Sequence, residues 1–319
     1  MSTAVSSPPR RLSLATVRSG QANSPDRILV SGTPGVGKST WAAGAPAPIF
    51  LCAEDGMPRA LAHVPRFPSP ESTDDVLDAI RSLTNDPHEY RTLVIDTIDW
   101  LEAIVWRTLC ERNGWKDKQG NPSIEGPGYG KGYVAATEEI RRIVAALETL
   151  RAKRGMEVIL LAHSAIKVFQ NPAGADYARY ELKLHKGAAA IFTEWSDCVL
   201  FAQYEEISTE KDIEKKGKSI ATGLRLVHTE RAAAWDAKNR HGLPPTLPLD
   251  YAEYARARDK GTPADPEALR AEAVKALAAS DLDDDARAKT TALIESIAGD
   301  GARLSHLINR LRARAKQEA

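Results

Sequence analysis

The feature that most constrains this chain of 319 residues is a glycine-rich run close to its start. Residues 32–39 read GTPGVGKS, which matches the pattern GxxxxGK followed by Ser or Thr. The apolar run Ile28–Val30 precedes it, and a helical pattern begins at Gly37. In such a strand, loop and helix, backbone N–H groups turn inward around phosphate groups, and the helix N-terminus adds positive potential. The sequence therefore predicts a phosphate-binding loop (P-loop) between a buried strand and a helix.

Two side chains of this loop have expected roles toward a nucleoside triphosphate. Lys38 is expected to reach the β- and γ-phosphates, and the hydroxyl of Ser39 is expected to bind Mg²⁺. The residues expected to contact the nucleotide are Gly32, Thr33, Pro34, Gly35, Val36, Gly37, Lys38, Ser39 and Thr40.

A P-loop also needs an acid that holds the metal, and Asp96 meets this need. It directly follows the apolar run Thr92–Ile95, which has the length and boundaries of a strand buried on both faces. Its carboxylate is therefore predicted to bind Mg²⁺ together with Ser39.

Hydrolysis further needs a group that orients or deprotonates water. Glu54 and Asp55 follow the apolar run Ile49–Cys52, at the strand edge where ligands bind in open α/β sheets. Of these two we select Glu54 as the catalytic residue, with Asp99 as the alternative. His163 ends the run VILLA, and we expect it to face the γ-phosphate and to report its presence to the loop that follows.

Short apolar runs alternate with helical patterns along most of the chain. This alternation predicts an α/β fold, with a mainly parallel sheet between helices, over a core at residues 25–250. Residues 1–24 are expected to form a flexible arm. Residues 255–319 are expected to form a small helical appendage, with a module that binds nucleic acid or a partner as the alternative. The predicted strands are Ile49–Cys52, Thr92–Ile95, Val158–Ala162, Cys198–Phe201 and Gly223–His228, and the predicted C-terminal helices are 266–279, 283–298 and 301–317.

Composition narrows the class of protein. The chain has 43 Lys and Arg residues and 43 Asp and Glu residues, so its net charge is zero. Net charge therefore cannot attract nucleic acid, although a local basic surface can. Three cysteines lie far apart, which favours reduced thiols in a cytoplasmic protein. The sequence has no run of 18 or more apolar residues, so it predicts no membrane span. The N-terminal segment lacks the apolar region of a secretory signal, and an organelle transit peptide is the alternative to a flexible arm.

Two segments, residues 113–133 and 164–186, are predicted to be unusually long loops. Both interleave cations with aromatic residues, which suits single-stranded nucleic acid because cations follow the phosphates while rings stack on bases. The alternative to nucleic-acid binding is that these loops form an ordered lid with ordinary surface charge. The candidate DNA-binding residues are Lys116, Lys118, Tyr129, Lys131, Lys167, Phe169, Arg179, Lys183 and Lys186.

The order of these landmarks resembles that of the RecA-like ATPases. Three later strings, GYGKGYVAATEEIRR, YELKLHKGAAAIFTEWSDCVLFA and AKNRHGLP, look like a phage-encoded branch of AAA-type ATP-binding proteins. That branch is close to the single-strand annealing recombinases of the Sak type. The resemblance covers roughly residues 25–250.

The resemblance implies a RecA-like P-loop NTPase core that binds ATP and Mg²⁺ between the subunits of a homo-oligomer. In such assemblies a cation near the end of the core reaches the neighbour's γ-phosphate, and Lys238 and Arg240 match that place. The alternative is that Lys238 and Arg240 are ordinary basic residues exposed to solvent. Single-stranded DNA is the implied partner, with a single-strand-binding protein as a further candidate, and the implied location is the cytoplasm of a bacterial host.

The leading hypothesis is thus a phage ATPase that binds single-stranded DNA in recombination or annealing and is stimulated by that DNA. A replicative helicase or helicase-loading ATPase is one alternative, and a nucleotide-dependent switch with negligible turnover is another. A small-molecule kinase would need a lid over a substrate pocket, whereas long basic loops suit a polymer better.

Overall fold

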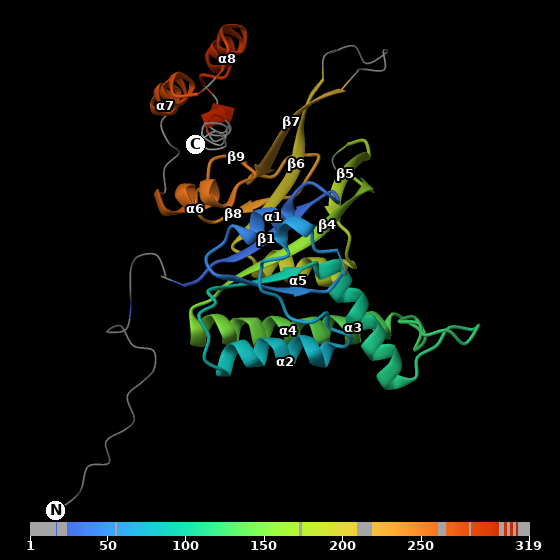
Figure 1. The fold of residues 1–319 in the computed structure, drawn as a ribbon. Helices are drawn as coiled ribbons and strands as arrows, with labels where there is room; N and C mark the ends of the chain where they lie inside the picture. Colours follow the sequence, from blue (N-terminus) through green and yellow to red (C-terminus); the bar gives the residue numbers. More distant parts are fainter. Residues whose placement is uncertain are drawn as a thin grey trace, which may run out of the picture.

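The computed structural model describes residue 17, residues 24–54, 56–171, 174–208, 219–260, 266–280 and 282–299, and five residues between 303 and 311. These residues form one sheet of nine strands with helices packed on both of its faces (Figure 1). The strands are β1 (Arg27–Gly32), β2 (Pro48–Cys52), β3 (Thr92–Asp96), β4 (Glu157–Phe169), β5 (Tyr177–Leu182), β6 (Cys198–Ser208), β7 (Ser219–His228), β8 (Lys238–Asn239) and β9 (Thr246–Pro248). The α-helices are α1 (Lys38–Ala43), α2 (Thr73–Asn85), α3 (Ile98–Asn113), α4 (Lys131–Arg154), α5 (Lys186–Trp195), α6 (Tyr251–Lys260), α7 (Pro266–Ala278) and α8 (Asp284–Ser296), with a 3₁₀ turn at Arg59–Leu61.

The strand order confirms the predicted fold class. The sequence β2-β3-β4-β1-β6 is parallel throughout, and β7 and β9 then extend the sheet in antiparallel fashion. β1 lies between β4 and β6, and its last residue, Gly32, pairs with His163 on one side and Ala202 on the other. The P-loop therefore leaves the sheet from its centre.

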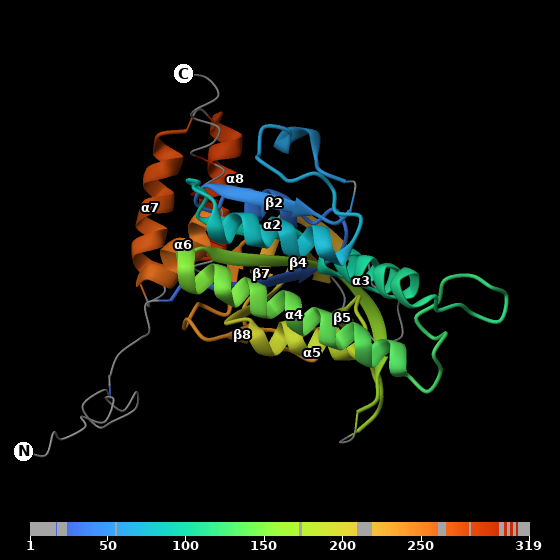
Figure 2. The same cartoon turned by 90° about the horizontal axis from the view of Figure 1, so that it is seen from below.

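Alternate residues of the parallel strands face two separate cores. Leu29 of β1 belongs to the core beneath α2, α3, α4 and α5, whereas Ile28 and Val30 belong to the core beneath α1 and α6. Figure 2 shows α2, α4 and α5 covering one side of the sheet. Strands buried on both faces read as continuous apolar runs, which is why they were recognisable in the sequence.

The segment predicted as a second long loop, residues 164–186, is mostly a β-hairpin, so that prediction was wrong. β4 continues seven residues beyond the predicted end at Ala162 and pairs with the antiparallel strand β5, with Lys167 opposite Arg179 and Phe169 opposite Tyr177. Exposed Ile166 and Val168 lie on one face of this extension. Such alternation of apolar and polar residues is a strand pattern.

The C-terminal part divides differently from the prediction. Tyr251 and Tyr254 of α6 are buried against Trp41, with ring centroids 5.2 and 5.5 Å from it, so the packed core continues through α6. α7 and α8 lie within two residues of two predicted helices and share a small apolar core of their own. Most of the third predicted helix, 301–317, lies outside the described residues.

Other predictions fall partly outside the described residues. The N-terminal arm, residues 1–24, is described only at positions 17 and 24. Within the described part of the chain, the helices are all too short or too polar to cross a membrane.

The first predicted loop is present between α3 and α4 and is fixed to the core at a glycine. A Cβ atom on Gly132, in the first turn of α4, would lie 1.8 Å from the carbonyl oxygen of Ile124. The side chain of Ile124 is itself buried. The loop therefore cannot separate from the start of α4 without losing a close backbone contact.

We predict that Gly132→Ala lowers the melting temperature of the protein, because the added methyl group collides with backbone that cannot rotate away. Overpacking of this kind costs about 1–3 kcal/mol of unfolding free energy. Gly299→Ala is the matched control, since a Cβ atom there meets nothing within 4 Å. Equal melting temperatures for the two variants in a thermal unfolding scan would contradict this packing.

Candidate active site

The P-loop adopts the conformation that phosphate binding requires. Gly35 and Gly37 have φ of 77° and 110°, values that residues with a side chain rarely adopt, and α1 begins immediately afterward at Lys38. The ammonium of Lys38 is buried and donates to the carbonyl oxygens of Gly32 and Thr33, each at 3.1 Å. Burial lowers the pKa of Lys38, and the nearby carboxylates of Asp96, Asp99 and Glu54 oppose that shift.

Asp96 lies at the end of β3, where the sequence placed the metal-binding acid. The hydroxyl of Ser39 donates to its carboxylate at 2.6 Å. Burial raises the pKa of Asp96, while the Ser39 hydrogen bond and the charge of Lys38 lower it. One hydroxyl and one carboxylate in contact form the oxygen donor set that suits Mg²⁺, which takes few protein ligands and completes its shell with water and phosphate.

No group of three or more His, Cys, Asp or Glu side chains that could hold a metal alone is found among the described residues.

Asp99 holds His163 in place, a contact that the sequence did not reveal. One oxygen of its carboxylate accepts from the backbone N–H of His163 at 2.9 Å, and the other accepts from the ring Nδ1–H at 2.9 Å. Burial alone would raise the pKa of Asp99, but the hydrogen bonds from His163 outweigh it and leave the pKa below its ordinary value. Asp99 is therefore a positioning residue, and both of its oxygens are occupied.

Glu54 carries a buried carboxylate oxygen that has no hydrogen-bond partner. Its side chain is 29% exposed, and its Oε2 lies 3.9 Å from Nδ1 of His163 and has no hydrogen-bond partner. Burial raises the pKa of Glu54, while the charge of His163 opposes the increase. A raised pKa improves a carboxylate as a base near neutral pH. Asp55, the neighbouring candidate, lies outside the described residues.

Strand register explains why these groups meet. Cys52 pairs with Asp96 across β2 and β3, and Gly32 pairs with His163 across β1 and β4. In a parallel sheet, matched registers bring Glu54 after β2, Asp96 at the end of β3 and His163 within β4 to the edge from which the P-loop leaves β1. The structure thus brings together Lys38, Ser39, Asp96, Glu54 and His163.

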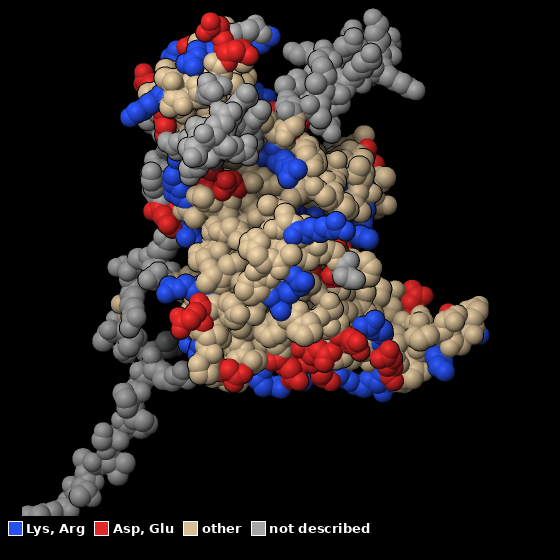
Figure 3. Space-filling model, in the orientation of Figure 1, with Lys and Arg blue, Asp and Glu red and all other residues tan. Residues whose placement is uncertain are grey.

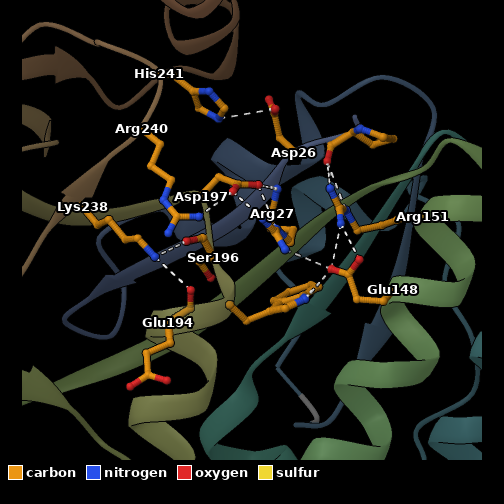
Figure 4. Close-up of polar contacts among 12 residues, drawn as sticks. Asp26, Arg27, Glu148, Arg151, Glu194, Ser196, Asp197, Lys238, Arg240 and His241 are labelled. Atoms are coloured by element: carbon orange, nitrogen blue, oxygen red, sulfur yellow. Dashed lines mark hydrogen bonds and ion pairs between the residues drawn. The ribbon is translucent and has the colours of Figure 1, made fainter. Parts of the chain in front are cut away.

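Lys238 and Arg240 lie near the amino end of β6, at the opposite end of the parallel strands from the P-loop. Figure 4 shows Lys238 beside Ser196 and Arg240 beside Asp197. Lys238 pairs with Val199 near the start of β6, whereas the P-loop follows the residue paired with Ala202, roughly 10 Å further along the strand. The ammonium of Lys238 donates to the carbonyl oxygens of Thr193, Glu194 and Ser196 at 2.6–3.0 Å and so caps the end of α5.

Arg240 is the freer of the two cations. Its guanidinium is 56% exposed and lies 3.4 Å from Asp197, whose carboxylate is already held by Arg27 at 2.6 Å. Within one chain, neither cation reaches the P-loop, so a role at the γ-phosphate requires the nucleotide of a neighbouring chain.

Most candidate DNA-binding residues lie at exposed positions, but the prediction for Arg179 was wrong. Its side chain is 2% exposed, paired with Asp236 at 2.7 Å and placed over the ring of Phe169 at 5.0 Å. A guanidinium held inside the hairpin cannot contact DNA directly, so Arg179 is removed from the candidates. The exposed candidates are Lys116, Lys118, Tyr129, Lys131, Lys167, Lys183 and Lys186.

The fold and the site define a P-loop NTPase. Residues 24–241 match the family AAA_24, described as an AAA domain. This match covers more than half of the chain, which therefore belongs to this AAA domain family, and nucleotide hydrolysis is the activity of such domains. No curated protein matches the chain.

We predict that Glu54→Gln lowers kcat for ATP hydrolysis by about 100-fold or more, because removal of a general base typically costs 10²–10⁴-fold. The affinity for ATP should change little. Since burial raises the pKa of Glu54, the wild-type rate should fall with decreasing pH through a pKa above that of an ordinary glutamate. Full turnover by Glu54→Gln would assign the base elsewhere.

Proposed function

We propose that this protein is an oligomeric ATPase that binds single-stranded DNA and acts in phage recombination or annealing. The observation that carries the proposal is the meeting of two helix N-termini, those of α4 and α5, each opening with an exposed lysine. α4 begins with Lys131 and α5 with Lys186, and glycine flanks both. Helix N-termini with lysines attract phosphate, which is the repeating anion of a nucleic acid strand.

Direct contacts hold these two helix starts together. The rings of Tyr133 and His185 are stacked, with centroids 4.4 Å apart. A Cβ atom on Gly187 would lie 2.8 Å from the hydroxyl of Thr137, so α5 approaches α4 closely. The loop between α3 and α4 and the β4–β5 hairpin, which lead into these helices, project from the same side of the molecule (Figures 1 and 2).

Helix α3 joins this surface to the nucleotide site. Asp99 in its first turn holds His163, where the hairpin begins, and Glu102 accepts from the backbone N–H of His185 at 3.0 and 3.2 Å, where the hairpin ends. The N–H of Lys183 also donates to the carbonyl of His163 at 2.9 Å. A change at the γ-phosphate that moves His163 therefore has a short path to the lysines, which supports coupling between ATP hydrolysis and DNA binding.

The charge distribution supports the same surface. Figure 3 shows acidic side chains in a band along the lower side of the molecule, over α2 and α4. There the acids pair with arginines, as Asp74 and Glu139 do with Arg112 at 3.2 Å. In a protein with equal numbers of basic and acidic residues, exposed lysines at the helix starts can still form a local site for polyanions.

We predict that the double variant Lys131→Ala/Lys186→Ala binds single-stranded DNA more weakly, because two phosphate contacts are removed. The slope of log K against log salt should fall by about 1.4, at about 0.7 for each contact with a single strand. Lys153→Ala is the control, since that exposed lysine lies at the other end of α4. An unchanged affinity and slope in the double variant would contradict DNA binding at this surface.

A mixing experiment tests the sharing of ATP sites between subunits. Arg240→Ala and Lys38→Ala are each expected to hydrolyse little ATP alone. In mixed oligomers, an intact P-loop from the first variant meets an intact Arg240 from the second, so activity should return to a fraction of the wild-type value. Absence of any recovery in oligomers shown to be mixed would contradict action across subunits.

The same proposal favours turnover over a switch that does not hydrolyse ATP. A water-activating carboxylate beside an oriented histidine serves hydrolysis, and a switch has no need of it. Duplex unwinding powered by ATP would identify a helicase instead, and it is measured in the same preparation.

A further inference from the structure

Two side chains touch the P-loop from strands that the sequence motifs do not include. The hydroxyl of Tyr204, on β6, donates to the carbonyl oxygen of Gly35 at 3.1 Å. Arg225, on β7, lies opposite Tyr204 in the strand ladder, and its guanidinium carbon lies 5.4 Å from the centre of the Tyr204 ring. The ladder shifts register directly beyond this pair, and such bulges often re-aim side chains beside active sites.

The guanidinium of Arg225 reaches the last glycine of the P-loop. A Cβ atom on Gly37 would lie 2.9 Å from Nη1 of Arg225 and 3.4 Å from a methyl carbon of Leu249. Arg225 is exposed, and among the described residues no acidic side chain forms an ion pair with it. The guanidinium of Arg225, which contacts the ring of Tyr204 and has no acidic partner among the described residues, thus lies beside the glycine that precedes Lys38.

The sheet order shows from which side Arg225 approaches. Asp96 ends β3 and His163 lies within β4, both on one side of β1, whereas β6 and β7 lie on the other side. The charges that act on Lys38 are those of Asp96, Asp99 and Glu54, all from the first side. If these groups hold the γ-phosphate and Mg²⁺, as the P-loop motif implies, Arg225 on the other side of β1 would face the phosphates nearer the nucleoside.

We propose that Arg225 is a second phosphate-binding cation of the nucleotide site. Supported by the ring of Tyr204, its guanidinium binds the α- and β-phosphates of the nucleotide from the side of the P-loop opposite Asp96. Arginine suits this task because its planar fork of donors matches two phosphate oxygens at once. The inference rests on nucleotide binding by the P-loop, but not on DNA binding or on oligomer formation.

Titration calorimetry of the full chain with Mg²⁺ and three ligands, ATP, ADP and inorganic pyrophosphate, tests this proposal. Arg225→Ala should raise the dissociation constants of all three by a similar factor of about tenfold or more, the usual loss for a hydrogen bond to a charged group. Arg225→Lys should recover part of the loss, and Tyr204→Ala should show a smaller loss of the same pattern.

Arg141→Ala is the control, since that arginine lies on the exposed face of α4 and is 57% exposed. Three results would overturn the proposal: unchanged affinities in Arg225→Ala, a loss confined to ATP, or weaker ATP and ADP binding with unchanged pyrophosphate binding, which would assign the contact to the nucleoside. If the wild type binds ATP no better than Lys38→Ala does, nucleotide binding itself fails, and this outcome is separate from the other three.

Discussion

The pairing of β1 with β4 on one side and β6 on the other sets the position of every group in the candidate site. Backbone hydrogen bonds place Gly32 beside both His163 and Ala202, and β3 then brings Asp96 to the same edge. Because these strands are parallel, residues that follow different strands meet where the P-loop begins. A shift of one residue in this register would turn the side chain of His163 to the opposite face of the sheet.

Two further arrangements depend on that sheet. Helix α3 starts directly after β3, so Asp99 and Glu102, one turn apart, reach both ends of the β4–β5 hairpin. At the opposite edge, the start of β6 carries β8, which places Arg240 far from the P-loop of its own chain. The first arrangement connects the P-loop edge of the sheet with the starts of α4 and α5, and the second leaves Arg240 away from the P-loop of its own chain.

The sequence predicted the parts of the site that depend on local pattern. A P-loop is contiguous, and strands buried on both faces show as apolar runs, so Lys38 and Asp96 could be placed without a structure. Pairings between distant segments left no local signal. The role of Asp99 depends on a contact 64 residues away, and the burial of Arg179 depends on an acid supplied by a later loop. Polar strands such as β5 are equally hard to recognise, because packing against a neighbour rather than intrinsic preference forms them.

In the proposed function, the nucleotide edge of the sheet and the two lysine-bearing helix starts act together, so that ATP hydrolysis is coupled to DNA binding. The most direct test measures steady-state ATP hydrolysis by the full chain with and without single-stranded DNA, beside the Lys38→Ala variant. We predict that DNA raises turnover several-fold and that Lys38→Ala abolishes turnover under both conditions. Turnover that depends on Lys38 but is indifferent to DNA would contradict the coupling, and would direct attention to a protein partner at the same surface.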